Sequence, residues 1–467
     1  MKKETNVTLV TVSIFIATFM TAIEGTIVTT AMPTIVGSLH GMEIMNWVFS
    51  IYLLTNAMLT PIYGKLADKV GRKPIFIFGT LLFIIGSLFC GLSQSMIGLI
   101  AARAIQGMGA GAMMPVALTI IGDLYSIEKR AKVLGLNSSA WGIASVFGPL
   151  AGGFIVETIS WHWIFFINVP LGLLAMALSL RIIPNIREEE RRPFDLPGFV
   201  ATSLAMISLV AAMERLGDQQ PQSWQTPALL ATGMGCMAFA LRHFRRAAWP
   251  MVRLDALQVP TFRITMYGGS LFRASISAVP FLLPLLFQVG FGMDAFHSGL
   301  LVLAVFVGNL TIKPATTPLI RWLGFRRLLL INGALNVASL LAYALLTPQT
   351  PVWLIMLILY LGGVFRSIQF TGVSTLAFAD VPSAQMSYAN TLFSTASQLA
   401  VGLGITLGAI GIRIGEQLSE WFNLTTLPGI DFRMAFVFIA LICLVGMVDT
   451  LHLTRDAGST VSSKEKP

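Results

Sequence analysis

Long apolar stretches separated by short polar loops dominate this sequence. A helix that crosses a bilayer needs about 20 mostly apolar residues. Fourteen stretches approach that length and predict an all-α polytopic membrane protein of about fourteen transmembrane helices. They lie at residues 8–31, 46–64, 74–94, 97–121, 133–156, 161–183, 196–213, 225–241, 264–289, 298–320, 328–346, 352–378, 388–412 and 434–452. If the seventh and eighth do not cross, the count is twelve and both termini stay on one side.

Composition and charge support a membrane protein and give its orientation. Apolar residues make up 55% of the chain and charged residues 11%, against roughly 25% charged in soluble domains. The net charge of +9 comes mainly from Lys and Arg in short loops, so it does not indicate a nucleic-acid partner. One alternate set of loops, together with the termini, holds 24 of the 31 basic residues, and the other set holds 3. The remaining four lie inside the apolar stretches. This bias predicts cytoplasmic termini in a bacterial inner membrane.

The chain divides into two halves around a charged segment at residues 187–192. We expect an N-terminal six-helix bundle over residues 1–190, a central helix pair over 191–250, and a C-terminal six-helix bundle with a cytoplasmic tail over 251–467. The loop after the second stretch ends Gly71-Arg72-Lys73, and the loop after the tenth contains Gly324-Phe325-Arg326-Arg327. This partial repeat favours a duplicated six-helix unit, as many transporters have.

Glu24 and Arg103 are ionisable residues inside two apolar stretches of the first half. Such residues are costly in lipid and normally face a cavity or a partner. Counting residues at about 1.5 Å each from the outer ends places both roughly 10 Å below the outer surface. Equal depth permits an ion pair that a proton can break, and a static structural pair is the alternative interpretation.

Four motifs carry a resemblance to a known family. The loop Gly64-Lys-Leu-Ala-Asp68-Lys-Val-Gly71-Arg72-Lys73 resembles the signature loop of the major facilitator superfamily. The stretch Arg103-Ala-Ile-Gln106-Gly-x-Gly-x-Gly resembles that family's fourth-helix motif. Gly142, Gly148, Pro149, Gly152 and Gly153 are similarly spaced to the fifth-helix antiporter motif, which marks exporters. The run from Trp161 to Pro170 resembles the drug:proton antiporter branch with fourteen helices, the EmrB/QacA and MdtD-like proteins.

The sequence departs from the branch pattern at three points. The first-helix acid is usually Asp and is here Glu24, followed by Thr29 where Asn is usual. His162 replaces the usual Arg between two tryptophans, and Arg321 replaces the Asp of the second loop copy. The first departure bears on the details of proton coupling.

The resemblance implies a proton-coupled exporter of small amphiphilic molecules or drugs that works by alternating access. Glu24 and Arg103 would then couple protons, and Gly64, Asp68, Gly71 and Arg72 would gate the cytoplasmic side. We expect the glycines and Pro149 of the fifth helix to give a stiff, closely packed helix, although generic small-residue packing explains them too. A proton-coupled importer of a nutrient or metabolite on the same fold is the alternative function.

Arg273, Lys313 and Arg366 lie in stretches of the second half that carry no accompanying acid. Each alone could snorkel toward the interface, but together they suggest a basic wall on a substrate cavity, to which we also assign Gln106. Expected partners are a small-molecule substrate, protons and the lipid bilayer, and we expect a monomer. No cofactor is expected, because the proton gradient supplies the drive and no G-x-x-x-x-G-K-[ST] motif occurs.

No enzyme or metal site is predicted either. The three cysteines Cys90, Cys236 and Cys443 are far apart and lack metal-ligand spacing. No set of nucleophile and base is visible in the sequence.

Overall fold

The computed structural model of the protein describes residues 7–124, 133, 143–144, 147–187, 194–216, 224–251, 253–382, 385–423, 427–454 and 457–458. Every regular element within these ranges is a helix, so the predicted all-α class is confirmed. The chain folds into two compact units, Met1–Leu196 and Pro197–Pro467. The division into three parts with a separate central pair stays a prediction.

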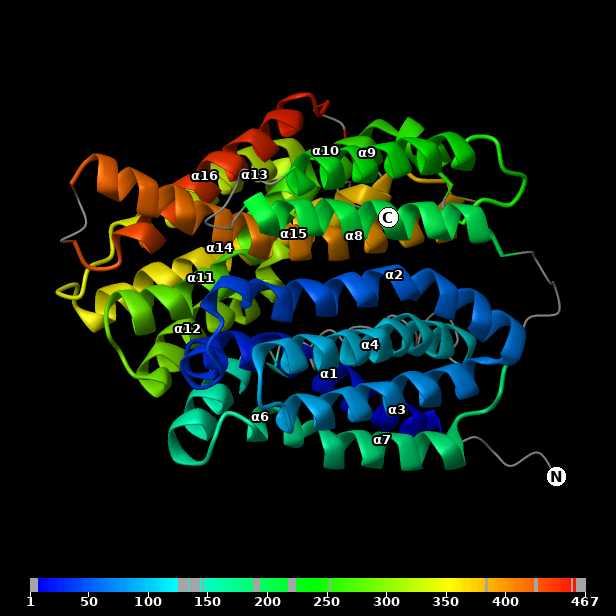
Figure 1. The fold of residues 1–467 in the computed structure, drawn as a ribbon. Helices are drawn as coiled ribbons and strands as arrows, with labels where there is room; N and C mark the ends of the chain where they lie inside the picture. Colours follow the sequence, from blue (N-terminus) through cyan, green and yellow to red (C-terminus); the bar gives the residue numbers. More distant parts are fainter. Residues whose placement is uncertain are drawn as a thin grey trace. The chain divides into compact units, whose positions relative to one another are not determined.

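The first unit is a bundle in which α4 (Met96–Leu124) lies between α2 (Asn46–Val70) and α3 (Arg72–Gly91) (Figure 1). α7 (Asn168–Ile182) packs against both α3 and α1 (Val7–Leu39). A 3₁₀ turn, Met42–Ile44, precedes α2, and the short α6 (Trp163–Phe166) precedes α7. Residues 147–158 form a further helical run.

The second unit begins with α8 (Leu196–Leu216), α9 (Gln225–Phe244) and the 3₁₀ turn Asp255–Gln258. α10 (Pro260–Ser277) then continues through α11 (Val279–Leu285) into one π-helical turn, Leu286–Gly290. The remaining helices are α12 (Ala295–Thr311), α13 (Lys313–Ala344), α14 (Val352–Ala379), α15 (Met386–Trp421) and α16 (Ile430–Leu451).

The two units repeat one packing scheme. As α4 packs between α2 and α3, α14 packs between α12 and α13. As α7 packs on α1 and α3, α16 packs on α10 and α13. The turns that precede the basic pairs also match, because Gly71 has φ 117° and ψ 153° while Gly324 has φ 71° and ψ 160°. Positive φ favours glycine, so the shared glycine reflects a similar non-helical break between two helical segments and supports the predicted duplication.

Nine helices in the described residues are long and apolar enough to cross a membrane, and two shorter apolar helices accompany them. Each of the fourteen predicted stretches overlaps helical residues, so the count of fourteen is compatible with the structure and stays a prediction. The tenth and eleventh stretches differ most from expectation. The break after α12 falls at Ile312, and two helical segments meet at a kink at Gly324 within α13 rather than across an open loop.

Exposed apolar stripes on the bundles fit a lipid environment. On α16, Leu441, Leu444, Val445 and Val448 are 49–60% exposed and recur at the spacing of one helix face. The opposite face buries Phe436, Ile439 and Cys443 against the bundle. A soluble helix has the reverse polarity, so this face is suited to contact with acyl chains.

Candidate functional site

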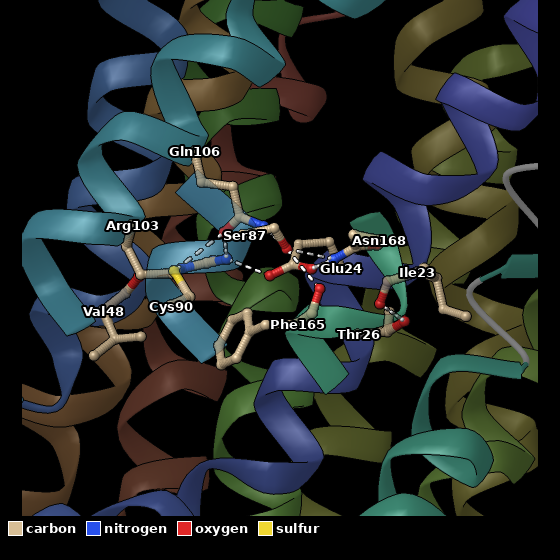
Figure 2. Close-up of polar contacts among 10 residues, drawn as sticks. All are labelled: Ile23, Glu24, Thr26, Val48, Ser87, Cys90, Arg103, Gln106, Phe165 and Asn168. Carbon is tan, nitrogen blue, oxygen red and sulfur yellow. Dashed lines mark hydrogen bonds and ion pairs between the residues drawn. The ribbon is translucent and has the colours of Figure 1, made fainter. Parts of the chain in front are cut away.

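Glu24 of α1 and Arg103 of α4 form an ion pair inside the first unit (Figure 2). Arg103 Nη1 lies 2.5 Å from Glu24 Oε1, and the two side chains are 2% and 0% exposed. The pair expected from equal membrane depth is therefore present. Removing either partner of such a pair would leave an uncompensated buried charge, which typically costs about 3–5 kcal/mol.

Arg103 is held by more than its carboxylate partner. Its Nη1 also donates to Gln106 Oε1 at 2.6 Å, one helical turn along α4. Its Nε donates to the carbonyl of Val48 on α2 at 3.0 Å, and the guanidinium lies 4.2 Å from the centroid of the Tyr52 ring. The planar fork of arginine suits these several contacts, which fix the cation between α2 and α4.

The second oxygen of Glu24 is bound from another helix. Asn168, the first residue of α7, donates through Nδ2 to Glu24 Oε2 at 2.5 Å and to Ser87 Oγ at 3.0 Å. Gln106 Nε2 donates to the same Ser87 oxygen at 3.1 Å, and Ser87 donates to the carbonyl of Phe165 at 2.9 Å. Glu24, Arg103, Gln106, Ser87 and Asn168 thus form a closed ring of hydrogen-bonded side chains from α1, α3, α4 and α7.

Glycines allow neighbouring helices to pack closely around this ring. A Cβ added at Gly86 of α3 would lie only 2.4 Å from the backbone nitrogen of Gln106, and one at Gly148 would overlap the side chain of Thr26. A Cβ at Gly152 would lie 3.0 Å from Ile27. The helical run 147–158 therefore packs on α1 immediately beyond Glu24, and the close approach predicted for the fifth-helix glycines is confirmed at Gly148 and Gly152. Pro149 and Gly153 are also buried, whereas Gly142 lies outside the described residues.

The signature loop lies against the end of α7. The backbone N–H of Arg72 donates to the carbonyl of Ile186 at 3.0 Å, and Lys73 Nζ donates to that of Leu180 at 2.6 Å. Arg72 is buried, and a Cβ at Gly71 would overlap Asn185. At Gly64, by contrast, no described atom beyond its own helix lies within 4 Å of an added Cβ. The side chain of Asp68 lies outside the described structure, and gating by this loop stays a prediction.

The cations of the second unit occupy separate environments. Arg273 of α10 is buried and donates to Ser397 Oγ at 2.6 Å. Its guanidinium lies 5.2 Å from the centroid of the Phe370 ring and 4.7 Å from that of the Phe393 ring. Its Nε and Arg366 Nη1 have no hydrogen-bond partner in the part of the chain that the structure describes.

Arg366 and Lys313 differ from Arg273 in their surroundings. Arg366 of α14 lines a small cavity with Asn336 and Tyr343 of α13, and Lys313 is half-buried at the start of α13. Gln106, which we also assigned to a substrate cavity, is wholly buried in the ring around Glu24. The assignment of these four residues to a substrate cavity stays a prediction.

Sequence reasoning missed two members of the ring. Ser87 is an ordinary serine in an apolar helix and gives no signal by itself. Asn168 could have been noticed, because it lies in the run from Trp161 to Pro170 that carries the family resemblance. An amide in an apolar run needs hydrogen-bond partners when buried, and this makes it a candidate site residue.

Comparison with known proteins identifies the family. The family model described as Major Facilitator Superfamily matches residues 14–405. The chain is 32% identical over 400 residues to a "Putative multidrug resistance protein MdtD" of Pectobacterium carotovorum, covering 85% of this chain and 86% of that protein. A protein of the same description from Salmonella paratyphi A is 32% identical over 396 residues, which are 84% of this chain and 83% of that one.

Solved structures show the same fold at low identity. A D-xylose–proton symporter matches with a TM-score of 0.67 at 15% identity, covering 97% of this chain and 99% of its own. A bacterial homologue of the human lysosomal transporter Spinster matches with a TM-score of 0.61 at 16% identity over the full length of both chains. With its helical units, apolar outer faces and family match, this chain belongs to the major facilitator superfamily and is a multi-pass membrane transporter.

Proposed function

We propose that this protein exports small amphiphilic molecules or drugs across the bacterial inner membrane in exchange for protons. Glu24 carries the proton, and Arg103 biases the charge state of its carboxylate. One observation supports this most directly: Glu24 and Arg103 form a wholly buried ion pair inside a ring of polar side chains. The names of the curated relatives support multidrug export as the physiological role.

Proton exchange at Glu24 has a simple electrostatic consequence. With Glu24 ionised, the ion pair ties α1 to α4, while Asn168 ties α1 to α7. Protonation of the carboxyl removes its negative charge and leaves Arg103 without a counter-charge. A buried cation without a partner is unfavourable, so the protonated state favours a conformation in which Arg103 finds water or another partner. This links proton loading to the conformational change of alternating access.

The direction of transport is proposed from the fifth helix. Gly148 and Gly152 pack tightly on α1 next to Glu24, which would limit a leak path beside the proton site. We propose antiport rather than import on this ground. The charge bias of the loops supports a proposed orientation with both termini in the cytoplasm.

The test is transport by purified protein in liposomes with an imposed pH gradient. Wild type should move a fluorescent amphiphile against its gradient, with the direction set by the proton gradient. Glu24→Gln should abolish this drive while the protein stays folded, and Glu24→Asp should retain part of it, because it keeps the carboxylate. Wild-type rates of gradient-driven transport by Glu24→Gln would contradict the proposal. Movement of substrate in the same direction as protons would favour the importer.

A further inference from the structure

The amide of Asn168 is placed to respond to the charge of Glu24. The side chain is fully buried, and both N–H groups are used, toward Glu24 Oε2 and Ser87 Oγ. Its carbonyl oxygen, Oδ1, is also buried and has no hydrogen-bond partner in the described structure. Buried acceptors are normally satisfied, so an orphaned oxygen beside a buried carboxylate calls for a physical reason.

The present orientation of the amide suits an ionised carboxylate. A carboxylate can only accept hydrogen bonds, and the NH₂ group supplies a donor. A protonated Glu24 would instead present an O–H donor toward the same position. The amide as it stands has no acceptor there, because its oxygen points elsewhere.

A rotation of the amide by half a turn would exchange the two groups. Oδ1 would then take the place of Nδ2 and could accept from the carboxylic acid of Glu24. The hydroxyl of Ser87 could donate to Oδ1 only by giving up its bond to the Phe165 carbonyl, while Gln106 would still donate to Ser87 Oγ. No bond to Oδ1 is broken by the rotation, because Oδ1 has no partner in the described structure. The rotation does give up the two bonds that Nδ2 donates, and in exchange it turns an acceptor toward Glu24. One orientation therefore matches the ionised carboxyl and the other the protonated carboxyl.

We propose that Asn168 is a positioning residue that matches both charge states of Glu24, donating to the carboxylate and, after its amide turns over, accepting from the carboxylic acid. This inference rests on the proposed function of Glu24. Asn168 would keep the protonated carboxyl hydrogen-bonded in the dry interior during the conformational change. α7 would thereby stay attached to α1 in both states, and only the contact between α1 and α4 would respond to the proton.

Other ionisable groups around the carboxylate do not offer this exchange. Arg103 of α4 is donor only, and Tyr52 of α2 and Cys90 of α3 interact with Glu24 electrostatically without a hydrogen bond to it among the described contacts. The helical run 147–158 carries one ionisable side chain, Glu157, which is exposed. The ionisable side chain of α7 is Arg181, which is also exposed.

The experiment measures protonation and transport separately. Infrared difference spectra of purified protein in nanodiscs, recorded as a function of pH, should show a carboxylic-acid C=O band that Glu24→Gln removes. The midpoint of that band reports proton binding at Glu24. Asn168→Leu removes both the donor to the carboxylate and the proposed acceptor for the acid. Because the charge-assisted bond to the carboxylate is the stronger of the two, the midpoint should rise, by up to about one pH unit or a tenfold gain in proton affinity. Asn168→Asp keeps the shape and places a second carboxyl beside Glu24. The two carboxyls should titrate as a coupled pair whose upper midpoint rises further, because two neighbouring negative charges repel.

Ser13→Ala is the matched control. Ser13 ties the same two helices, α1 and α7, through bonds to Ala175 O at 3.0 Å and Ser179 Oγ at 2.7 Å, and it has no described contact with Glu24. This variant should keep the wild-type midpoint even if it lowers stability. An unchanged midpoint in both Asn168 variants, or an equal shift in Ser13→Ala, would overturn the assignment of Asn168.

The transport assay distinguishes failure of the proposed role of Asn168 from failure of the proposed function. If Asn168 has no such role, wild type remains proton-driven, Glu24→Gln remains inactive, and only the Asn168 midpoints fail to move. If the proposed function is wrong, wild-type transport does not follow the pH gradient whatever the spectra show. Since Asp and Asn have nearly the same shape, Asn168→Asp keeps the test available if Asn168→Leu does not fold.

Discussion

At the residue scale, the geometry of Arg103 explains why arginine rather than lysine occupies this position. Its guanidinium reaches Glu24, Gln106 and the Val48 carbonyl at the same time and stacks on Tyr52. A lysine ammonium is a compact point charge on a flexible stem and cannot reproduce this planar arrangement. The ion pair with Glu24 requires only a positive charge, whereas the hydrogen-bonded ring also requires the several N–H donors of the planar guanidinium.

Arg103→Lys should therefore separate charge from geometry. We expect the variant to fold, because the charge opposite Glu24 is kept, but to lose at least about tenfold in proton-driven transport as hydrogen bonds to charged groups contribute about 1.5–3 kcal/mol each. Arg103→Ala should be far less stable in thermal unfolding, since it leaves Glu24 uncompensated. Arg181→Lys, an exposed site on α7, should behave like wild type. Wild-type transport by Arg103→Lys would show that only the charge matters.

At the element scale, the helical run 147–158 packs closely against α1 next to Glu24. Gly148 meets Thr26 and Gly152 meets Ile27, two and three residues beyond Glu24. Small residues let two helices approach closely in a membrane, where dispersion contacts drive association. A larger side chain here must push the two helices apart.

Gly148→Ala should lower the thermal unfolding midpoint, because overpacking typically costs about 1–3 kcal/mol. Thr26→Ala removes the hydroxyl that the new methyl group would overlap, so the double variant should recover part of the loss. Gly25→Ala is the control, since no described atom lies within 4 Å of its added Cβ. Strictly additive effects of Gly148→Ala and Thr26→Ala in a double-mutant cycle would contradict this contact.

The start of α12 provides a pH-dependent feature outside the spanning segments. Asp294 caps the helix by accepting the backbone N–H of His297 at 2.9 Å, and this hydrogen bond lowers the pKa of its carboxyl, with smaller contributions from the His297 side chain. A lowered folded-state pKa stabilises the protein above the unfolded value. That stabilisation is lost as the pH falls through the folded value.

Acidification to below about pH 4, near the ordinary pKa of Asp, should therefore weaken this cap. Because the carboxyl is largely exposed, the change should be small, well under about 1 kcal/mol. Asp294→Asn keeps a capping acceptor and should remove this part of the pH dependence, which thermal unfolding at pH 7 and at acid pH would measure. An identical acid shift in wild type and Asp294→Asn would assign the effect to other groups.

At the scale of the whole molecule, charge is distributed unequally between the duplicated units. The first unit pairs its buried Arg103 with Glu24, whereas Arg273 and Arg366 of the second unit have no acidic partner among the described residues. Like charges at close range repel by several kcal/mol even with an effective dielectric near 20. If these cations face the substrate, an anion, zwitterion or neutral amphiphile should be accepted more readily than a bare cation.

Competition between matched anionic and cationic amphiphiles tests this prediction. Anionic and zwitterionic competitors should inhibit transport more strongly, and Arg366→Ala or Lys313→Ala should narrow the difference. Because Lys313 is only half-buried, Lys313→Ala should have a smaller effect on this preference than Arg366→Ala. A strong preference for permanently charged cations that neither variant alters would show that these residues do not select the substrate.

The sequence by itself determined the helical class, the approximate spans and the pairing of Glu24 with Arg103. Hydrophobic length and the cost of charge in lipid act locally along the chain, so they can be read without coordinates. Gly324 and Gly71 were recognisable as a repeat for the same reason, since a positive φ is a local requirement. Only the tertiary structure placed Ser87 and Asn168 beside Glu24, because their roles depend on which helix faces meet. It also showed where glycine allows close packing: a Cβ at Gly148 would overlap α1, whereas one at Gly64 would meet no described atom of another helix within 4 Å. Spacing along one helix cannot show what lies opposite it.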